Sequence, residues 1–178
     1  MGKLVFILGG ARSGKSRFAA EYAGKSKPVL YIATYKRTGD KEMEERIRRH
    51  KKNRPEGWKV LEEPVELSRA IRQNLTHRGI SIIIDCITLW VSNLLLKKKN
   101  LEEILEETDC LLKTIKNTDA TFILVSNEVG MGVVPVTRMG RKFRDIAGIV
   151  NQTIARDADE VYFMLAGIPI KMRHKNRP

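Results

Sequence analysis

The sequence predicts an α/β fold, in which a mostly parallel sheet carries helices on both faces. Three observations predict it: short, nearly continuous apolar runs, amphipathic segments that alternate with them, and a glycine-rich loop between the first run and the first helix. Continuous apolar strands are typical of sheets buried on both faces, and strand–helix alternation is typical of parallel sheets. The chain has 178 residues, 42% hydrophobic and 30% charged, which fits one domain. We expect that domain over residues 1–170 and a basic tail at residues 171–178.

The apolar runs predict six strands, and the segments between them predict six helices. The strands are expected at Lys3–Leu8, Pro28–Thr34, Trp58–Leu61, Ile80–Cys86, Thr121–Ser126 and Glu160–Ala166. The helices are expected after Ser16, from about residue 40 to residue 52, and at Val65–Leu75, Leu89–Leu96, Leu101–Ile115 and Phe143–Ala155. The segment from residue 40 to 52 has acidic residues near its start and basic residues near its end, a polarity that complements the helix dipole.

The loop after the first strand matches the complete Walker A pattern, with Gly9, four further residues and then Gly14-Lys15-Ser16. Its glycines let the backbone curl so that N–H groups point at phosphate oxygens, and the following helix adds the positive end of its dipole. We expect Lys15 to act catalytically on the outer phosphates of a nucleotide, and Ser16 to hold Mg²⁺. The nucleotide-binding residues of this loop are then Gly9, Gly10, Ala11, Arg12, Ser13, Gly14, Lys15 and Ser16. The fold is therefore expected to be P-loop NTPase-like; the alternative is a glycine-rich turn that binds nothing.

A magnesium site beside such a loop needs a carboxylate at the end of another strand. The apolar run Ser81–Ile84 is followed by Asp85, which meets that requirement. We therefore expect Asp85 to hold Mg²⁺ together with Ser16. A strand-terminal aspartate that caps the next helix is the compatible alternative.

The formal net charge is +12, and three segments account for it: residues 36–54 carry +5, residues 136–145 carry +3 and residues 171–178 carry +4. Concentrated positive charge favours a polyanion or a phosphorylated small molecule as partner. Aromatic residues make up only 6% of the chain, which leaves few stacking surfaces for single strands. We expect no nucleic-acid partner; a nucleotide-dependent nucleic-acid-binding module is the alternative from another class.

The N-terminus lacks the length and the cleavage site of a signal peptide, and no run approaches the ~18 apolar residues of a spanning helix. We expect a cytoplasmic protein without a membrane-spanning segment. Cys86 lies in an apolar run and Cys110 in a helical pattern, which predicts two buried thiols rather than a disulfide.

The chain has three histidines, and His50 differs from the others because arginines and lysines surround it in the charged helix. Neighbouring cations favour a neutral, nucleophilic imidazole, and the same cations can bind a triphosphate. From the residues alone, a solvated basic helix with an incidental histidine is the favoured interpretation.

Five motifs occur in one order along the chain. They are Gly9–Ser16, Tyr31–Thr34, Arg46–Pro55 with Trp58, Asn127–Pro135 and Phe143–Gln152. Together they resemble the bifunctional adenosylcobinamide kinase/adenosylcobinamide-phosphate guanylyltransferase family of cobalamin biosynthesis, over about residues 4–170. A Walker A loop alone is generic, whereas the NEVGMGVVP and FRDIAGIVNQ blocks beside the histidine segment are far more specific.

The resemblance implies two reactions. A nucleoside triphosphate, ATP or GTP, phosphorylates the aminopropanol hydroxyl of adenosylcobinamide, and GTP then transfers GMP to that phosphate with release of pyrophosphate. The resemblance also implies a GMP-histidine intermediate at His50. The implied nucleotide contacts outside the phosphate loop are Ala33, Thr34, Tyr35, Lys51, Lys52, Asn53, Arg54, Glu62 and Asp85. A shift of one residue would exchange Glu62 with Glu63, and a surface carboxylate is the alternative for Glu62.

The implied partners are adenosylcobinamide, its phosphate and GTP, with Mg²⁺ as cofactor. Members of the resembled family form trimers, so we expect a homo-oligomer. A single-activity P-loop small-molecule kinase with an inert His50 is the nearest alternative.

The segment Asn127–Gly132 follows a strand and is expected at the same sheet edge as the phosphate loop, either over a bulky substrate or as a tight turn. The motifs identify neither the general base of the kinase step nor the residues that contact the corrinoid.

Overall fold

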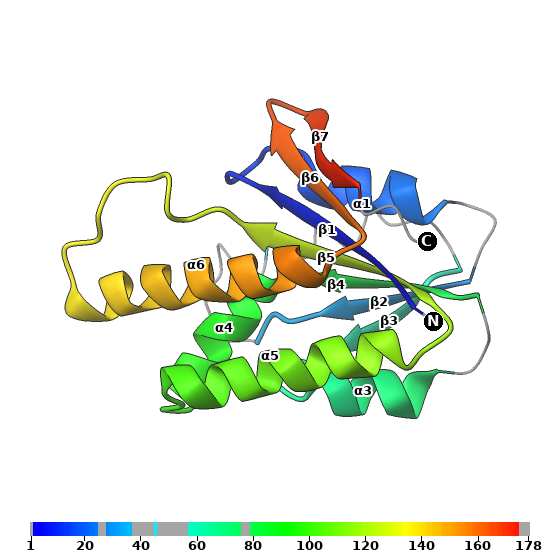
Figure 1. Ribbon diagram of the computed structural model, residues 1–178, viewed down its shortest axis with the longest axis horizontal. Helices are drawn as coiled ribbons and strands as arrows, with labels where there is room; N and C mark the ends of the chain where they lie inside the picture. Colours follow the sequence, from blue (N-terminus) through cyan, green and yellow to red (C-terminus); the bar gives the residue numbers. More distant parts are fainter. Residues whose placement is uncertain (1, 25–27, 37–44, 46–56, 76–78, 175–178) are drawn as a thin grey trace.

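The computed structural model describes residues 2–24, 28–36, 45, 57–75 and 79–174. They form a seven-stranded sheet in the order β3-β2-β4-β5-β1-β6-β7, parallel except for β7 (Figure 1). The strands are β1 (Lys3–Gly9), β2 (Val29–Ala33), β3 (Lys59–Glu62), β4 (Ser81–Asp85), β5 (Thr121–Asn127), β6 (Glu160–Leu165) and β7 (Ile168–His174). The six expected strands are confirmed, and β7 is an addition.

The described helices cover both faces of the sheet, as the apolar strands predict. They are α1 (Lys15–Ala23), α3 (Leu67–Asn74), α4 (Ile87–Leu96), α5 (Leu101–Lys116) and α6 (Arg138–Asp157). Figure 1 shows α1 on one side of the sheet and the other four on the opposite side. Each of these described helices is too short or too polar to cross a membrane. The expected helix from residue 40 to 52 lies outside the described residues except for Glu45, which is helical and exposed.

Alternation along the strands divides the core into two clusters. In β1, Phe6 packs with α3–α6, whereas Ile7 packs with α1 on the other face, and both are fully buried. Successive side chains of a strand point to opposite faces of the sheet, so burial of both faces requires apolar side chains in both directions. Because helices cover both faces, a ligand is expected at the edge formed by the carboxyl ends of the strands, as is typical of open α/β sheets.

Helix α6 begins earlier than its apolar pattern predicts. The expected start was Phe143, but the helix begins at Arg138, where the Thr137 hydroxyl accepts a hydrogen bond from the Gly140 N–H at 3.1 Å. The threonine cap starts the helix one turn before its buried face, since Met139 in the first turn is exposed. Cys110 also differs from expectation, because it is exposed on α5, whereas Cys86 is buried as expected.

Strand β7 contains residues that were expected in a basic tail. Lys171–His174 pair with β6 as the second arm of an antiparallel hairpin, so the expected boundary after residue 170 falls inside a strand. Residues 175–178 lie outside the described part of the chain. The pairing brings the positive charge of Lys171 to within 3.1 Å of Glu160, which gives this segment an electrostatic reason to fold.

Glu160 is the centre of a polar cluster at the amino edge of the sheet. Its carboxylate is 2.6 Å from the Lys3 ammonium, 3.1 Å from Lys171, and accepts hydrogen bonds from Tyr22 at 3.0 Å and Tyr162 at 2.6 Å. Burial raises the pKa of Glu160, but these hydrogen bonds outweigh it and lower the pKa to about 2. The cluster fastens β1, α1, β6 and β7 to one another.

Candidate active site

The predicted site residues that the structure describes come from strands that end at the carboxyl edge of the sheet. Ala33 is in register with Glu62 on one side and with Asp85 on the other. Gly9, which opens the phosphate loop, is in register with Asn127 and with Met164. Strand β5 lies between the strands that carry Asp85 and the phosphate loop, so the sheet order, rather than sequence proximity, assembles this edge.

The phosphate loop is held in place by its own glycines and by the β6–β7 turn. Gly9 has φ 152°, and a Cβ atom there would lie 2.6 Å from the Met164 carbonyl oxygen. The Ser13 carbonyl accepts a hydrogen bond from the Gly167 N–H at 3.0 Å, and Gly14 is the N-cap of α1. The loop therefore has little room for any residue but glycine at its first position.

Lys15 folds back into the loop. Its ammonium donates to the carbonyls of Gly9 at 2.9 Å and Gly10 at 2.6 Å, and to the Ser13 hydroxyl at 3.4 Å. The residue is only 7% exposed, and burial lowers its pKa, against the attraction of nearby Asp85. All three partners are neutral, so phosphate oxygens can replace them with stronger, charge-assisted hydrogen bonds.

Asp85 is oriented from β2. The Tyr31 hydroxyl donates to Asp85 Oδ2 at 2.6 Å, and the Tyr31 ring stacks on Trp58 with centroids 6.3 Å apart. Helix α4 takes Cys86 as its N-cap without a side-chain hydrogen bond, so Asp85 does not cap that helix. A carboxylate and the half-buried Ser16 hydroxyl are oxygen donors of the type that Mg²⁺ prefers, and the attraction of Asp85 raises the pKa of Lys15 against the effect of burial.

Thr34 has a structural role. It is fully buried; its hydroxyl donates to the Cys86 carbonyl at 2.7 Å and accepts from the Cys86 N–H at 2.8 Å. The Asn93 amide donates to the Thr34 carbonyl at 2.8 Å. Burial raises the pKa of Cys86 to about 12, so its thiol stays protonated. Among the three adjacent residues expected to contact nucleotide, Ala33 and Tyr35 are half-buried, whereas the Thr34 side chain is occupied within the protein.

The structure distinguishes the two neighbouring glutamates after β3. Glu63 holds the turn before α3, because its Oε1 accepts from the N–H groups of Val65 at 2.9 Å and Glu66 at 2.8 Å. Glu62 is exposed at the sheet edge, in register with Ala33. Glu63 is thus occupied by the turn before α3, and a nucleotide contact by Glu62 stays a prediction.

The histidine segment lies outside the described residues. This applies to His50 and to the expected nucleotide contacts Lys51, Lys52, Asn53 and Arg54. Their roles stay predictions.

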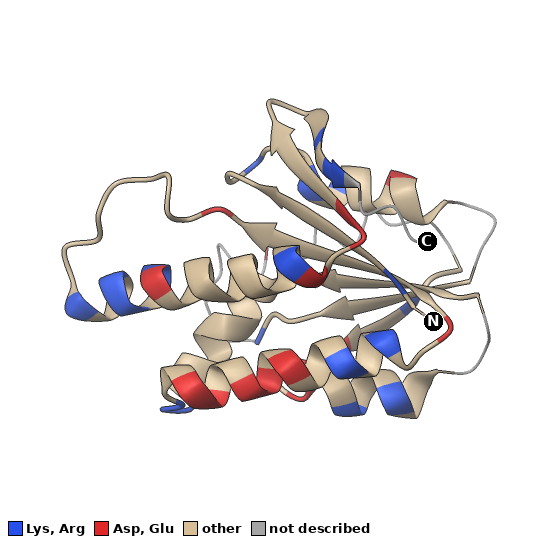
Figure 2. Ribbon diagram, in the orientation of Figure 1, with Lys and Arg blue, Asp and Glu red and all other residues tan. Residues whose placement is uncertain are grey.

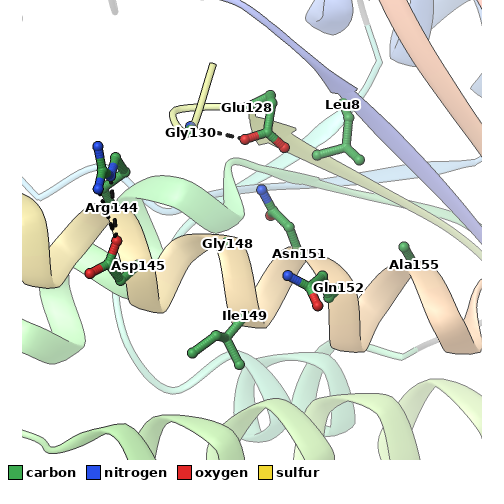
Figure 3. A pocket seen from close by; sticks show the side chains of 10 residues that line it. All are labelled: Leu8, Glu128, Gly130, Arg144, Asp145, Gly148, Ile149, Asn151, Gln152 and Ala155. Atoms are coloured by element: carbon green, nitrogen blue, oxygen red, sulfur yellow. Dashed lines mark hydrogen bonds and ion pairs between the residues drawn. The ribbon is translucent and has the colours of Figure 1, made fainter. Parts of the chain in front are cut away.

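A pocket between the end of β5 and α6 contains residues that the sequence analysis did not assign. Its volume is about 380 Å³ (Figure 3). It is lined by Leu8, Glu128, Gly130, Arg144, Asp145, Gly148, Ile149, Asn151, Gln152 and Ala155. The helix residues among them lie at positions 144, 145, 148, 149, 151, 152 and 155, which is the three- and four-residue spacing of one helix face. This spacing, next to the Asn127–Gly132 segment, is the signal that could have found the pocket.

A buried hydrogen-bond network supports the floor of this pocket. Ser126 donates to Asn151 Oδ1 at 2.8 Å and lies 3.0 Å from the Thr88 hydroxyl. Asn151 donates to the Asn127 carbonyl at 3.2 Å, and the Asn127 N–H donates to Thr88 at 2.6 Å. The network fixes the end of β5 between α4 and α6.

Basic residues gather in the first turns of α6, beside the exposed loop that precedes it (Figure 2). Arg141 donates to the carbonyls of Pro135 at 3.1 Å and Val136 at 2.7 Å, so it ties this loop to the helix. Arg144 contacts Asp145 at 3.3 Å. Two of these cations thus have partners within the protein.

Two solved structures share this architecture. The Pyrococcus horikoshii OT3 protein PH0250 matches with TM-score 0.60 at 8% identity, over 99% of this chain and 88% of its own. The RadB recombinase matches with TM-score 0.52 at 12% identity, over 99% and 84%. With the Walker A loop between β1 and α1, these likenesses show a P-loop NTPase-like α/β fold.

Residues 5–172 match the family described as cobinamide kinase / cobinamide phosphate guanyltransferase. The bifunctional adenosylcobalamin biosynthesis protein CobP of Pseudomonas aeruginosa is 42% identical over 168 residues, or 94% of this chain and 95% of that protein. The corresponding CobU proteins of Escherichia coli and Salmonella typhimurium are 39% and 41% identical, each over 96% of this chain and 99% of the relative. The chain therefore belongs to the cobinamide kinase / cobinamide phosphate guanyltransferase family.

Proposed function

We propose that this protein phosphorylates adenosylcobinamide and then transfers GMP from GTP to the product, by way of a GMP-histidine at His50. Family membership over nearly the whole chain supports the two activities. The observation that carries the proposal at the site is the complete phosphate loop with the Lys15 ammonium buried inside it.

In the kinase step, the loop binds the outer phosphates. Lys15 exchanges its carbonyl partners for phosphate oxygens, and the loop amides and the amino end of α1 add further positive potential. Ser16 and Asp85 would hold Mg²⁺, which neutralises charge on the phosphates when bound. The loop thereby stabilises the nucleoside diphosphate as it leaves the transferred phosphoryl group.

In the guanylyl step, the neutral His50 imidazole attacks the α-phosphorus of GTP, a P–N bond forms, and pyrophosphate leaves toward the phosphate loop. Lys15 stabilises the charge on that leaving group. The phosphate of adenosylcobinamide phosphate then attacks the same phosphorus and releases the imidazole. The proposed nucleotide contacts are Ala33, Thr34, Tyr35, the segment Lys51–Arg54, Glu62 and Asp85.

We also propose a homo-oligomer, a trimer by family resemblance, in the cytoplasm where nucleotides are available. Exposed apolar side chains support association. Val133 and Val136 are 94% and 93% exposed in the loop before α6, and Ile168 and Met172 are 64% and 66% exposed on β7. Association of copies of the chain would remove such apolar side chains from water.

The test is covalent labelling with GTP carrying label at the α- or the γ-phosphate, in the presence of Mg²⁺. We expect the denatured wild-type protein to retain label from α-labelled GTP only, because the intermediate keeps the α-phosphate. The bond should break in acid and survive in alkali, as a phosphoramidate does. His50→Ala should retain none, whereas His77→Ala, the matched control, should label like the wild type.

Absence of label from either nucleotide, or full labelling of His50→Ala, would contradict the guanylyltransferase half. The remaining interpretation would be a single-activity P-loop kinase with an inert His50.

A further inference from the structure

The pocket between β5 and α6 lies directly beside the phosphate loop. Leu8, the residue before the loop, forms part of its wall, and Glu128 forms another part. The Glu128 N–H donates to the Gly9 carbonyl at 3.1 Å, and the Lys15 ammonium donates to the same carbonyl at 2.9 Å. The Gly9 carbonyl oxygen therefore accepts hydrogen bonds from both Lys15, the lysine of the phosphate loop, and Glu128, which lines the pocket.

The Glu128 carboxylate is oriented by a short backbone turn. Its Oε1 accepts from the Gly130 N–H at 2.9 Å, and Figure 3 shows the carboxylate above α6, on the side where Asn151 lies. A Cβ at residue 130 would lie 3.0 Å from that oxygen, so glycine permits this close approach. The turn therefore fixes the Glu128 carboxylate in the lining of the pocket.

Other described carboxylates at this edge have different positions or partners. Asp85 is bound by Tyr31 and electrostatically coupled to Lys15, and Glu62 lies on β3, at the far end of the sheet from β1. Asp145 contacts the guanidinium of Arg144. The Glu128 carboxylate borders the pocket, and the backbone N–H of the same residue bonds the Gly9 carbonyl of the phosphate loop.

The lining of the pocket suits a short polar arm. It combines two carboxylates, Glu128 and the Arg144-bound Asp145, with the Arg144 guanidinium, the amides of Asn151 and Gln152 and the apolar Leu8 and Ile149. A volume of about 380 Å³ accommodates an aminopropanol group but not a corrin macrocycle. The arm of a large acceptor would therefore enter while the macrocycle stays outside.

We propose that this pocket receives the hydroxyl-bearing arm of the acceptor, and that Glu128 is the general base of the kinase step. This inference rests on the proposed function and adds the acceptor site and a catalytic residue to it. The acceptor oxygen forms a bond to the γ-phosphorus while the bond to the β-phosphate oxygen breaks. The hydroxyl proton passes to the Glu128 carboxylate and from there to water, and the nucleoside diphosphate leaves on the loop side.

The two activities of the protein provide an internal control. The kinase step removes a proton from an alcohol, whereas the guanylyl step uses a phosphate that already carries negative charge. A base for the alcohol is therefore needed in the first step only. Glu128→Gln keeps an oxygen that can accept from the Gly130 N–H, so the turn is expected to stay folded.

The experiment measures label transfer from γ-labelled GTP to adenosylcobinamide, and from α-labelled GTP to adenosylcobinamide phosphate, with the full-length protein. For Glu128→Gln we expect kcat of the first reaction to fall by about 10²-fold or more, with KM for the corrinoid within about threefold of wild type. The second reaction should stay within about threefold. Glu106→Gln, an exposed glutamate on α5, is the matched control and should leave both reactions unchanged.

Gly130→Ala is the second variant. Its Cβ would displace the carboxylate without removing it, so we expect a smaller loss in kinase kcat, about tenfold, with guanylyl transfer retained. Wild-type kinase kcat in Glu128→Gln, or an equal loss in both reactions, would overturn the assignment of Glu128. If the wild-type protein transfers no label to either corrinoid, the proposed function itself fails.

Discussion

The two edges of the sheet use charged residues in different ways. At the amino edge, the Glu160 carboxylate meets two ammonium groups and two phenol hydroxyls at 2.6–3.1 Å. At the carboxyl edge, the buried Lys15 ammonium meets two backbone carbonyls and one hydroxyl. The first group is hydrogen-bonded to groups of opposite charge within the protein, whereas the second donates its hydrogen bonds to neutral partners, with Asp85 attracting it from nearby.

This difference separates a structural cluster from a ligand site. A ligand that replaced the partners of Glu160 would have to break ion pairs, so binding at that cluster would not be favourable. Replacing the partners of Lys15 with phosphate oxygens adds opposite charge to a buried cation, which is favourable. Burial and hydrogen bonding alone would not distinguish the two edges; the charge of the partners does.

The largest effect is expected from disrupting the carboxyl edge at Gly9. In Gly9→Ala, the new Cβ would lie 2.6 Å from the Met164 carbonyl, in a backbone region that disfavours side chains. We expect the free energy of unfolding to fall by about 3–4 kcal/mol, as measured by urea denaturation. Gly10→Ala is the matched control, because nothing lies within 4 Å of its Cβ and the cost should be below about 1 kcal/mol. Equal stability of the two variants would contradict the packing described for the loop.

A somewhat smaller effect is expected at the amino edge, and it depends on pH. The pKa of Glu160 in the folded protein is about 2, below the ordinary value of 4.5. Its contribution to stability is therefore complete above pH ~5 and is lost as the pH falls toward 2. We expect Glu160→Gln to be about 2–3 kcal/mol less stable than wild type at pH 7, with the difference shrinking as the pH falls to 2. A difference that stays constant over this range in denaturation experiments would show that the carboxylate charge is not what stabilises the cluster.

The smallest effect compares one tyrosine at each edge. Tyr31→Phe removes the hydrogen bond to Asp85, which is 2.6 Å long, so we expect the Mg²⁺ concentration for half-maximal kinase activity to rise by about two- to fivefold. Tyr162→Phe removes a hydrogen bond of the same length to Glu160 and should leave the Mg²⁺ dependence unchanged. Steady-state assays over a range of Mg²⁺ concentrations measure both variants. Identical Mg²⁺ curves for the two variants would argue against Asp85 as a magnesium ligand.

Most strands and the phosphate loop could be predicted because local patterns specify them. The Walker A spacing and the apolar runs ending at Leu8 and Asp85 are contiguous signals, and each lies where expected. The strand order could not be predicted, because β5 pairs with both β1 and β4 through packing that no local pattern records. Strand β7 was missed because its charge pattern resembles a tail, although Ile168, Ile170 and Met172 alternate with the period of a strand.

The site was predicted only in part, for a related reason. The residues of the phosphate loop are contiguous, so a motif finds them. The pocket joins Leu8 and Glu128 to a face of α6 that begins at Arg144, three segments that come together only in the folded chain. The role of Thr34 also depends on a partner 52 residues away, Cys86, and the sequence alone could not show that its hydroxyl is occupied.

In the proposed function, one sheet edge transfers two different groups to one acceptor. The most direct measurement is a time course of the wild-type protein with adenosylcobinamide, GTP and Mg²⁺, with the corrinoids separated by chromatography and identified by mass spectrometry. We predict that adenosylcobinamide phosphate forms first and is then converted to adenosylcobinamide-GDP with release of pyrophosphate. GTP consumption without any change in the corrinoid would contradict the proposed function.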